Sequence, residues 1–215
     1  MTTLRAMSAR FWFAATGVMA TLGVLIDLVA GVRAGPPSFA AGWSSALHTL
    51  FFYTIQSNLL VAGVSFTLSL RPGTRSKTFS VFLLIALTAI SMSGIVFNTL
   101  LMSTRGAGLA AVGSDLTHIV TPVLAFVGWL AFGPRRALSW RLIPAAFSFP
   151  LAWAGVTLLR GQLTESYPYF FVDAGRLGYV AALLNMAGLG MFFVIVAAAF
   201  VGLDWVTWRI GSDPR

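Results

Sequence analysis

Six long apolar runs constrain the fold of this chain more than any other feature of its sequence. Each is long enough to cross a bilayer as an α-helix, which takes about 17 to 25 residues. Only 9% of the 215 residues are charged, whereas a soluble domain carries roughly a quarter. The sequence therefore predicts an all-α integral membrane protein, with residues 1–215 forming one bundle of six transmembrane helices. The predicted spans lie near 11–31, 47–70, 78–102, 113–133, 142–159 and 177–203.

The lysine and arginine residues between these runs predict how the bundle is oriented. With the N-terminus in the cytoplasm, ten basic residues lie on the inner side: Arg5, Arg10, Arg71, Arg75, Lys77, Arg135, Arg136, Arg141, Arg209 and Arg215. Four lie on the outer side: Arg33, Arg105, Arg160 and Arg176. Because cytoplasmic loops are enriched in Lys and Arg, both termini are expected in the cytoplasm, in a multi-pass protein of the plasma (inner) membrane. The same placement accounts for the net charge of +8, so no nucleic-acid partner is expected.

Composition also excludes several kinds of chemistry. The chain has no cysteine, and its two histidines are too few for a histidine-built metal centre. Phosphate loops, dinucleotide fingerprints, zincin motifs and the Gly-x-Ser-x-Gly elbow are not found. We therefore expect neither a metal ion nor an organic cofactor.

A cluster of polar side chains interrupts the second apolar run. The segment "FFYTIQSNLLVAG", residues 51–63, carries Thr54, Gln56, Ser57 and Asn58 within little more than one helical turn. Hydrocarbon offers these groups no hydrogen-bond partner, so the protein must supply one. A threonine or serine in a membrane helix commonly bonds to the carbonyl four residues earlier, and an asparagine commonly joins two helices. These structural roles remain open for Thr54, Ser57 and Asn58.

Other polar residues are expected at the same level of the bundle. In the predicted orientation, Thr54 and His118 both lie on the order of 10 Å below the outer surface, at about 1.5 Å per residue. Asn98, Asn185 and Asp27 approach the same end of their helices. The sequence therefore predicts a polar cavity that opens toward the outer leaflet.

Four stretches of the sequence together resemble a known family. They are "FFYTIQSNLLVAG" (51–63), "DLTHIVTPVLAFVGWLAFGP" (115–134), "LLRGQLTESYPYFFVDAGRLGY" (158–179) and "LLNMAGLG" (183–190). In order and spacing they resemble the androgen-induced-gene and androgen-dependent-TFPI-regulating family of multi-pass membrane hydrolases. The likeness is closer to that family's bacterial branch, the Pr6Pr membrane proteins. The loop "YPYFFVDAGR" departs from the family's Tyr-Pro-aromatic-Pro-Phe pattern.

The resemblance implies that Thr54 in "FYTIQSN" is a nucleophile and that His118 in "LTHIVTP" is its base. The eukaryotic members of the family hydrolyse fatty acid esters of hydroxy fatty acids with such a pair. Around this pair we assign further candidate roles from residue chemistry. The candidates for stabilising the oxyanion or for lining a polar pocket are Asn58 first, Asn98 second, and then Gln56, Ser57 and Asn185. The candidate for orienting the imidazole is Asp115 or Asp27. The candidates for binding the substrate head group are Tyr167, Tyr169, Asp173 and Arg176.

The function predicted from the sequence is therefore metal-independent hydrolysis of a lipid carboxylic ester by a threonine. Its partners would be membrane lipids or amphiphilic acyl esters, and the oligomeric state is left open. Two alternatives also fit a polar cavity in a membrane bundle: a small-molecule or lipid transporter or channel, and a lipid-binding protein without catalysis.

Overall fold

The computed structural model describes residues 3–34 and 45–212, and this part of the chain is helical with no strand. The all-α prediction is confirmed for these residues. The helices are α1 (Thr3–Ala34), α3 (Tyr53–Leu70), α4 (Lys77–Val96), α5 (Leu109–Asp115), α6 (Thr121–Phe132), α7 (Ile143–Thr164), α8 (Ala174–Leu177) and α9 (Tyr179–Ser212). Two π-helical turns, η1 (Phe97–Leu101) and η3 (Leu116–Val120), and three 3₁₀ turns, η2 (Met102–Thr104), η4 (Trp140–Leu142) and η5 (Phe170–Val172), join them.

Five helical segments in the described residues are long and apolar enough to cross a membrane, not the six that the sequence predicted. They are Leu4–Arg33, Lys77–Thr104, Leu109–Phe132, Trp140–Thr164 and Tyr179–Arg209. The predicted span near 47–70 corresponds to α3, which has 18 residues and starts only at Tyr53. Its four polar residues lower its mean hydropathy, and it packs inside the bundle against α1 and α4. The five segments still indicate a multi-pass membrane protein.

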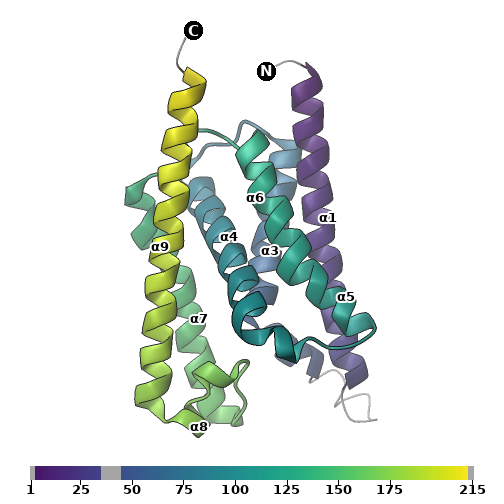
Figure 1. Ribbon diagram of the computed structural model, residues 1–215, viewed down its shortest axis with the longest axis vertical. Helices are drawn as coiled ribbons and strands as arrows, with labels where there is room; N and C mark the ends of the chain where they lie inside the picture. Colours follow the sequence, from purple (N-terminus) through teal and green to yellow (C-terminus); the bar gives the residue numbers. More distant parts are fainter. Residues whose placement is uncertain (1–2, 35–44, 213–215) are drawn as a thin grey trace.

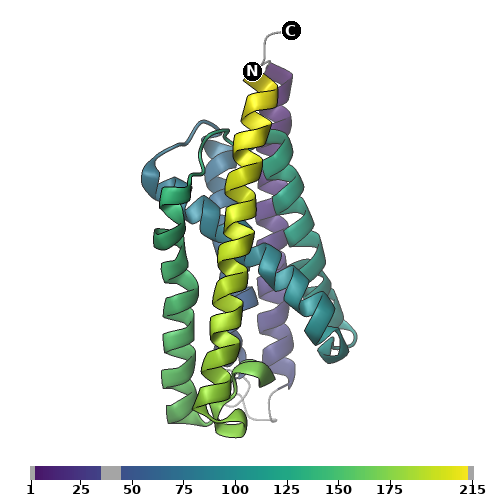
Figure 2. The same ribbon diagram turned by 60° about the vertical axis from the view of Figure 1, so that its left-hand side comes forward.

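Successive long helices run in opposite directions (Figure 1). As a result α1 begins and α9 ends at the same end of the molecule, and α8 lies at the opposite end, as Figure 2 also shows. We call these the terminal end and the α8 end. The loops α3–α4 and α6–α7 lie at the terminal end, whereas α3 begins at the α8 end. Arg215, one of the ten basic residues predicted to lie on the cytoplasmic side, lies outside the described residues.

The distribution of side chains also fits a lipid environment. Large apolar residues on the outer faces of the helices are solvent-exposed, such as Phe11, Leu163 and Val180, each more than three-quarters exposed. Polar residues instead lie inside, where Ser57, Asn58 and others are completely buried. An apolar exterior around polar interior groups is expected for a bundle surrounded by hydrocarbon.

A buried carboxylate holds the loop between α6 and α7 at the terminal end. Asp204 of α9 is completely buried, and its two carboxylate oxygens accept hydrogen bonds from the backbone N–H groups of Arg136, at 3.2 Å, and Leu138, at 2.9 Å. Backbone donors compensate part of the desolvation of a buried charge. Asp204 thus connects the last helix to a loop nearly 70 residues earlier.

We expect Asp204→Ala to destabilise the protein, because it leaves the buried N–H of Leu138 and the part-buried N–H of Arg136 without an acceptor. Each unsatisfied group costs roughly 1–3 kcal/mol. The measurement is the thermal unfolding midpoint of the detergent-solubilised protein. Glu165→Ala, at an exposed carboxylate, serves as the control and should leave the midpoint unchanged. Equal midpoints for the two variants would contradict this role of Asp204.

Candidate active site

The hydroxyl of Thr54 is the meeting point of three other polar side chains. Thr54 lies in the first turn of α3 and is 7% exposed. Its Oγ1 is 3.1 Å from Nε2 of His118 and accepts a 2.8 Å hydrogen bond from Oγ of Ser93. The phenol oxygen of Tyr169 lies 3.4 Å from both Oγ1 and the backbone N of Thr54. Four segments distant in sequence therefore converge on one oxygen.

Two π-helical turns bring α4 and His118 together. His118 lies in η3, and Asn98 lies in η1 at the end of α4. The Asn98 amide donates to the carbonyl of Gly94 at 2.8 Å and to that of His118 at 3.2 Å. A Cβ at Gly94 would lie 3.1 Å from the His118 carbonyl oxygen, so glycine permits this close approach. Single π-helical turns inside α-helices occur frequently at functional sites.

The environment of the imidazole fixes which nitrogen carries the proton. Nδ1 of His118 is 3.0 Å from the carbonyl oxygen of Ser114 and 3.1 Å from Oγ1 of Thr117. Because a carbonyl can only accept, Nδ1 carries the hydrogen and neutral His118 presents the lone pair of Nε2 to Thr54. The ring of Phe97 stacks on the imidazole, with 3.7 Å between ring centroids. This geometry suits a general base for the Thr54 hydroxyl.

The two carboxylates predicted as orienting acids differ in their contacts. Asp115 forms a two-pronged ion pair with Arg105, at 2.8 and 2.6 Å, and both side chains are about 40% exposed. This bond raises the pKa of Arg105. Asp27 instead accepts a 3.3 Å hydrogen bond from Oγ1 of Thr117, the hydroxyl next to Nδ1 of His118. In the described part of the chain, Ser114 and Thr117 rather than a carboxylate contact the imidazole directly.

The polar residues of α3 other than Thr54 mostly bind backbone carbonyls. The amide of Asn58 donates to the carbonyls of Thr54, at 2.9 Å, and Thr117, at 3.2 Å. Ser57 donates to Tyr53 four residues earlier, and Gln56 to Leu50. Asn58, like Asn98, uses both amide hydrogens on carbonyls, so this structure leaves neither residue an N–H for an oxyanion.

The predicted head-group residues are divided between the site and the loop around it. Tyr169 reaches Thr54, but Asp173 instead accepts from the backbone N–H of Arg176 at 3.1 Å and caps α8. Tyr167 packs over Gly161 of α7. Asn185 donates to the carbonyl of Phe171 at 2.8 Å and so holds the loop against α9. Burial raises the pKa of the Tyr169 phenol, which keeps it a hydrogen-bond donor at neutral pH.

Two residues of the site were not anticipated from the sequence. Ser93 looks like any other serine of an apolar helix, and only its contact with Thr54 distinguishes it. The sequence identifies Arg160 only as a basic residue of a predicted outer loop. Its guanidinium donates to the carbonyl of Ser166 at 3.1 Å and to Nδ1 of His48, and it lies 4.6 Å from the centre of the Phe51 ring. Arg160 thus ties the Tyr169 loop to the segment before α3.

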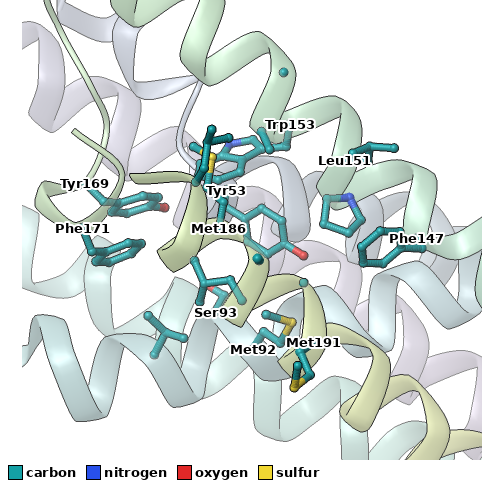
Figure 3. Close-up of a pocket in the computed structure, with 18 of the residues that line it drawn as sticks. Tyr53, Met92, Ser93, Phe147, Leu151, Trp153, Tyr169, Phe171, Met186 and Met191 are labelled. Atoms are coloured by element: carbon teal, nitrogen blue, oxygen red, sulfur yellow. The ribbon is translucent and has the colours of Figure 1, made fainter. Parts of the chain in front are cut away.

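Thr54 lies at the junction of two cavities. The first, of about 650 Å³, lies among α3, α4, α7 and α9, and its walls are mostly apolar (Figure 3). The second, of about 560 Å³, lies toward α1 and η3 and includes Asp27, Ser114 and His118. We call the first the apolar cavity and the second the polar cavity, because the second includes these polar groups although the rest of its walls is mostly apolar. Thr54 and Tyr169 line both.

Among residues 3–34 and 45–212, no group of three or more His, Cys, Asp or Glu side chains comes together as a metal site requires. Comparisons of the chain with models of protein families, with curated proteins and with solved structures find no match. The geometry of the site therefore carries the functional argument.

Proposed function

We propose that this membrane protein is a hydrolase, and specifically an intramembrane threonine hydrolase of lipid carboxylic esters. The observation that carries the proposal is the 3.1 Å contact between Oγ1 of Thr54 and Nε2 of His118, at the junction of the two cavities. A threonine hydroxyl is a weak nucleophile, and an adjacent base within about 2.6–3.2 Å activates it. The stretches that resemble the androgen-induced-gene family support the same assignment.

In the first half of the reaction, Nε2 of His118 takes the proton of the Thr54 hydroxyl while Oγ1 attacks the ester carbonyl carbon. The carbonyl oxygen becomes an oxyanion. When the tetrahedral intermediate collapses, the bond to the alcohol oxygen breaks, and this oxygen takes the proton from His118. The alcohol leaves, and the acyl group remains on Thr54 as an ester.

In the second half, a water molecule from the polar cavity replaces the alcohol. His118 removes a proton from this water, which attacks the acyl carbon, and the proton returns to Oγ1 of Thr54 as the acid is released. The polar cavity suits this step because its walls include Asp27, Ser114 and His118. The acyl chain would lie in the apolar cavity throughout.

Two hydroxyl donors are placed to stabilise the oxyanion. Ser93 donates to Oγ1 of Thr54 at 2.8 Å, and the Tyr169 phenol is 3.4 Å from the same atom. The carbonyl oxygen of the tetrahedral intermediate is bonded to the carbon that Oγ1 attacks, so donors around Oγ1 are close to it. Preorganised donors of this kind commonly supply a large part of the rate enhancement of acyl transfer.

In this proposal the terminal end faces the cytoplasm. Basic residues concentrate there, at the start of α1, in the loops α3–α4 and α6–α7, and at the end of α9. This is the side on which membrane proteins carry most Lys and Arg. Thr54, at the start of α3, then lies in the outer half of the bundle, and an ester in the outer leaflet is its substrate.

Covalent labelling with a fluorophosphonate probe tests the proposal. The detergent-solubilised protein should become labelled on Thr54, as located by peptide mass spectrometry, because the probe phosphonylates activated hydroxyl nucleophiles. Labelling should disappear in Thr54→Ala and His118→Ala and persist in Thr67→Ala, a matched change on the same helix whose hydroxyl bonds to the Gly63 carbonyl. Labelling that survives Thr54→Ala would contradict the assignment of Thr54 as the nucleophile. A folded protein that takes up no probe would favour a lipid-binding protein without catalysis.

A further inference from the structure

Asp27 is a carboxylate inside the bundle, and no step of the proposed reaction needs its charge. It lies near the end of α1, is partly exposed and lines the polar cavity. Among the described residues its one polar contact is the 3.3 Å hydrogen bond from Oγ1 of Thr117. Carboxylates inside membrane bundles are costly, and they usually have a charged partner or lie on the path of a substrate or ion.

The chain supplies no cation to pair with this carboxylate. Among the described residues that line the polar cavity, Asp27 is the one carboxylate, and there is no lysine or arginine. Residues 35–44, which follow α1 and lie outside the described part, contain no lysine, arginine or histidine. The one ion pair in the described part of the chain joins Arg105 and Asp115 instead. A cation that pairs with Asp27 therefore has to come from a bound molecule.

Aromatic rings line the same cavity. They belong to Phe52, Phe97, Tyr169 and Phe170. Phe52 contacts Tyr169 edge-on, with 5.3 Å between the ring centroids, which helps to fix this part of the wall. A calcium or magnesium ion would need several oxygen ligands, whereas this wall has one carboxylate. A substituted ammonium group is bulky and weakly hydrated, and proteins bind such groups with aromatic rings.

The position of Asp27 relative to the catalytic pair places such a cation on the alcohol side of the ester. Oδ2 of Asp27 is 3.3 Å from Oγ1 of Thr117, which is 3.1 Å from Nδ1 of His118. Nε2, on the other side of the imidazole, is next to Thr54. One ring and one hydroxyl thus separate the carboxylate from the nucleophile. Since the acyl chain lies in the apolar cavity, the alcohol part of the ester lies in the polar cavity with Asp27.

We propose that the polar cavity binds an alcohol that carries an ammonium group on a short alkyl chain, with Asp27 as the counter-ion of that group. This inference rests on the proposed function and deepens it by naming the class of alcohol that the ester contains. It differs from the substrate that the resemblance implies. A hydroxy fatty acid would bring a second carboxylate to the alcohol side, where the charge of Asp27 repels it.

Competition binding to the Thr54→Ala protein tests this proposal without turnover. The palmitoyl esters of choline, 3,3-dimethylbutanol and glycolate each displace a fluorescent fatty ester from the detergent-solubilised protein. The dimethylbutyl ester has the shape of the choline ester without its charge, and the glycolate ester carries a carboxylate. The choline ester should bind about tenfold more tightly than the neutral ester, as expected for a partly desolvated cation beside a carboxylate and aromatic rings. The glycolate ester should bind more weakly than the neutral one.

In the Asp27→Asn, Thr54→Ala double variant this order of affinities should disappear. The neutral ester should bind as before, which shows that the variant is folded. Glu165→Gln in the Thr54→Ala background is the matched control, because Glu165 is exposed and lies outside both cavities, and it should keep the order. All variants are compared in the same detergent, so any difference in how the esters partition into micelles cancels.

Two outcomes would overturn the proposal. One is equal binding of the choline ester and the neutral ester to the protein that retains Asp27, a comparison that needs no change at this residue. The other is a preference for the choline ester that survives Asp27→Asn. Both results are independent of catalysis. A protein with intact Thr54 that binds the choline ester through Asp27 but hydrolyses no ester would overturn the proposed function instead.

Discussion

Replacing Thr54 by alanine should abolish ester hydrolysis, with kcat/KM lower by at least about a thousandfold. In the proposed reaction the side chain supplies the attacking oxygen, and no other hydroxyl is as close to Nε2 of His118 as the 3.1 Å of Thr54 in the described structure. His118→Ala should cause a similar loss, because the hydroxyl then keeps its proton. Release of p-nitrophenol from an acyl ester by the detergent-solubilised protein provides the measurement.

The double variant distinguishes a catalytic unit from two independent contacts. Residues that act in one step are not additive, so Thr54→Ala combined with His118→Ala should be no slower than either single variant. Thr54→Ser, which keeps the nucleophilic oxygen, should retain measurable activity, whereas Thr54→Val, which keeps the shape, should not. Equal activity of the serine and valine variants would show that Thr54 serves packing rather than chemistry.

The sequence was a good guide to the helices because their main determinant is local. Membrane helices require long apolar runs, and the structure has a helix at each predicted position, although α3 starts at Tyr53 rather than near residue 47. The number of spans was less predictable. The polar residues that reduce the mean hydropathy of α3 are the same residues that form hydrogen bonds inside the bundle. The composition of α3 therefore argues against a membrane span, although much of the helix is buried in the bundle.

The geometry of the site was predictable only in part. Equal depth on two helices suggested that Thr54 and His118 could meet, and their side chains do. Asp115 was one of the two predicted orienting acids and lies three residues before His118, but η3 begins directly after Asp115, and a π-helical turn changes the register of the residues that follow. Asp115 pairs with Arg105, which lies in the preceding loop. Such a choice of partner depends on tertiary packing, which periodicity does not describe.

Ser93 and Tyr169 contact Thr54 only because the fold brings together segments that are far apart in the sequence. Tyr169 reaches Thr54 across 115 residues, from a loop held by Arg160 and Asn185. No local pattern distinguishes Ser93 from Ser91 two residues earlier, yet Ser93 alone of the two is within hydrogen-bond distance of Thr54 in the described residues. Because of this difference, comparing alanine variants of Ser93 and Ser91 tests how the proposed oxyanion is stabilised.

Ser93→Ala should lower kcat by about a hundredfold and leave KM nearly unchanged. Removing one preorganised donor from an oxyanion site costs about 10²–10³ in kcat, and the lower value applies because the Tyr169 phenol remains near the same atom. A donor that acts mainly on the transition state changes kcat, whereas one that holds the ground-state substrate changes KM. Steady-state kinetics on a p-nitrophenyl ester separate the two.

Ser91→Ala, on the same helix, is the matched control and should retain full activity. Ser93→Thr should recover part of the loss, because it keeps a hydroxyl next to Oγ1 of Thr54. Only a chemical role of Thr54 predicts that Ser93→Ala loses activity, that Ser93→Thr recovers part of it and that Ser91→Ala keeps it. A raised KM with unchanged kcat would instead make Ser93 a binding residue. Equal losses in the two serine variants would mean that α4 responds to any change in its packing, and the oxyanion would then depend on Tyr169.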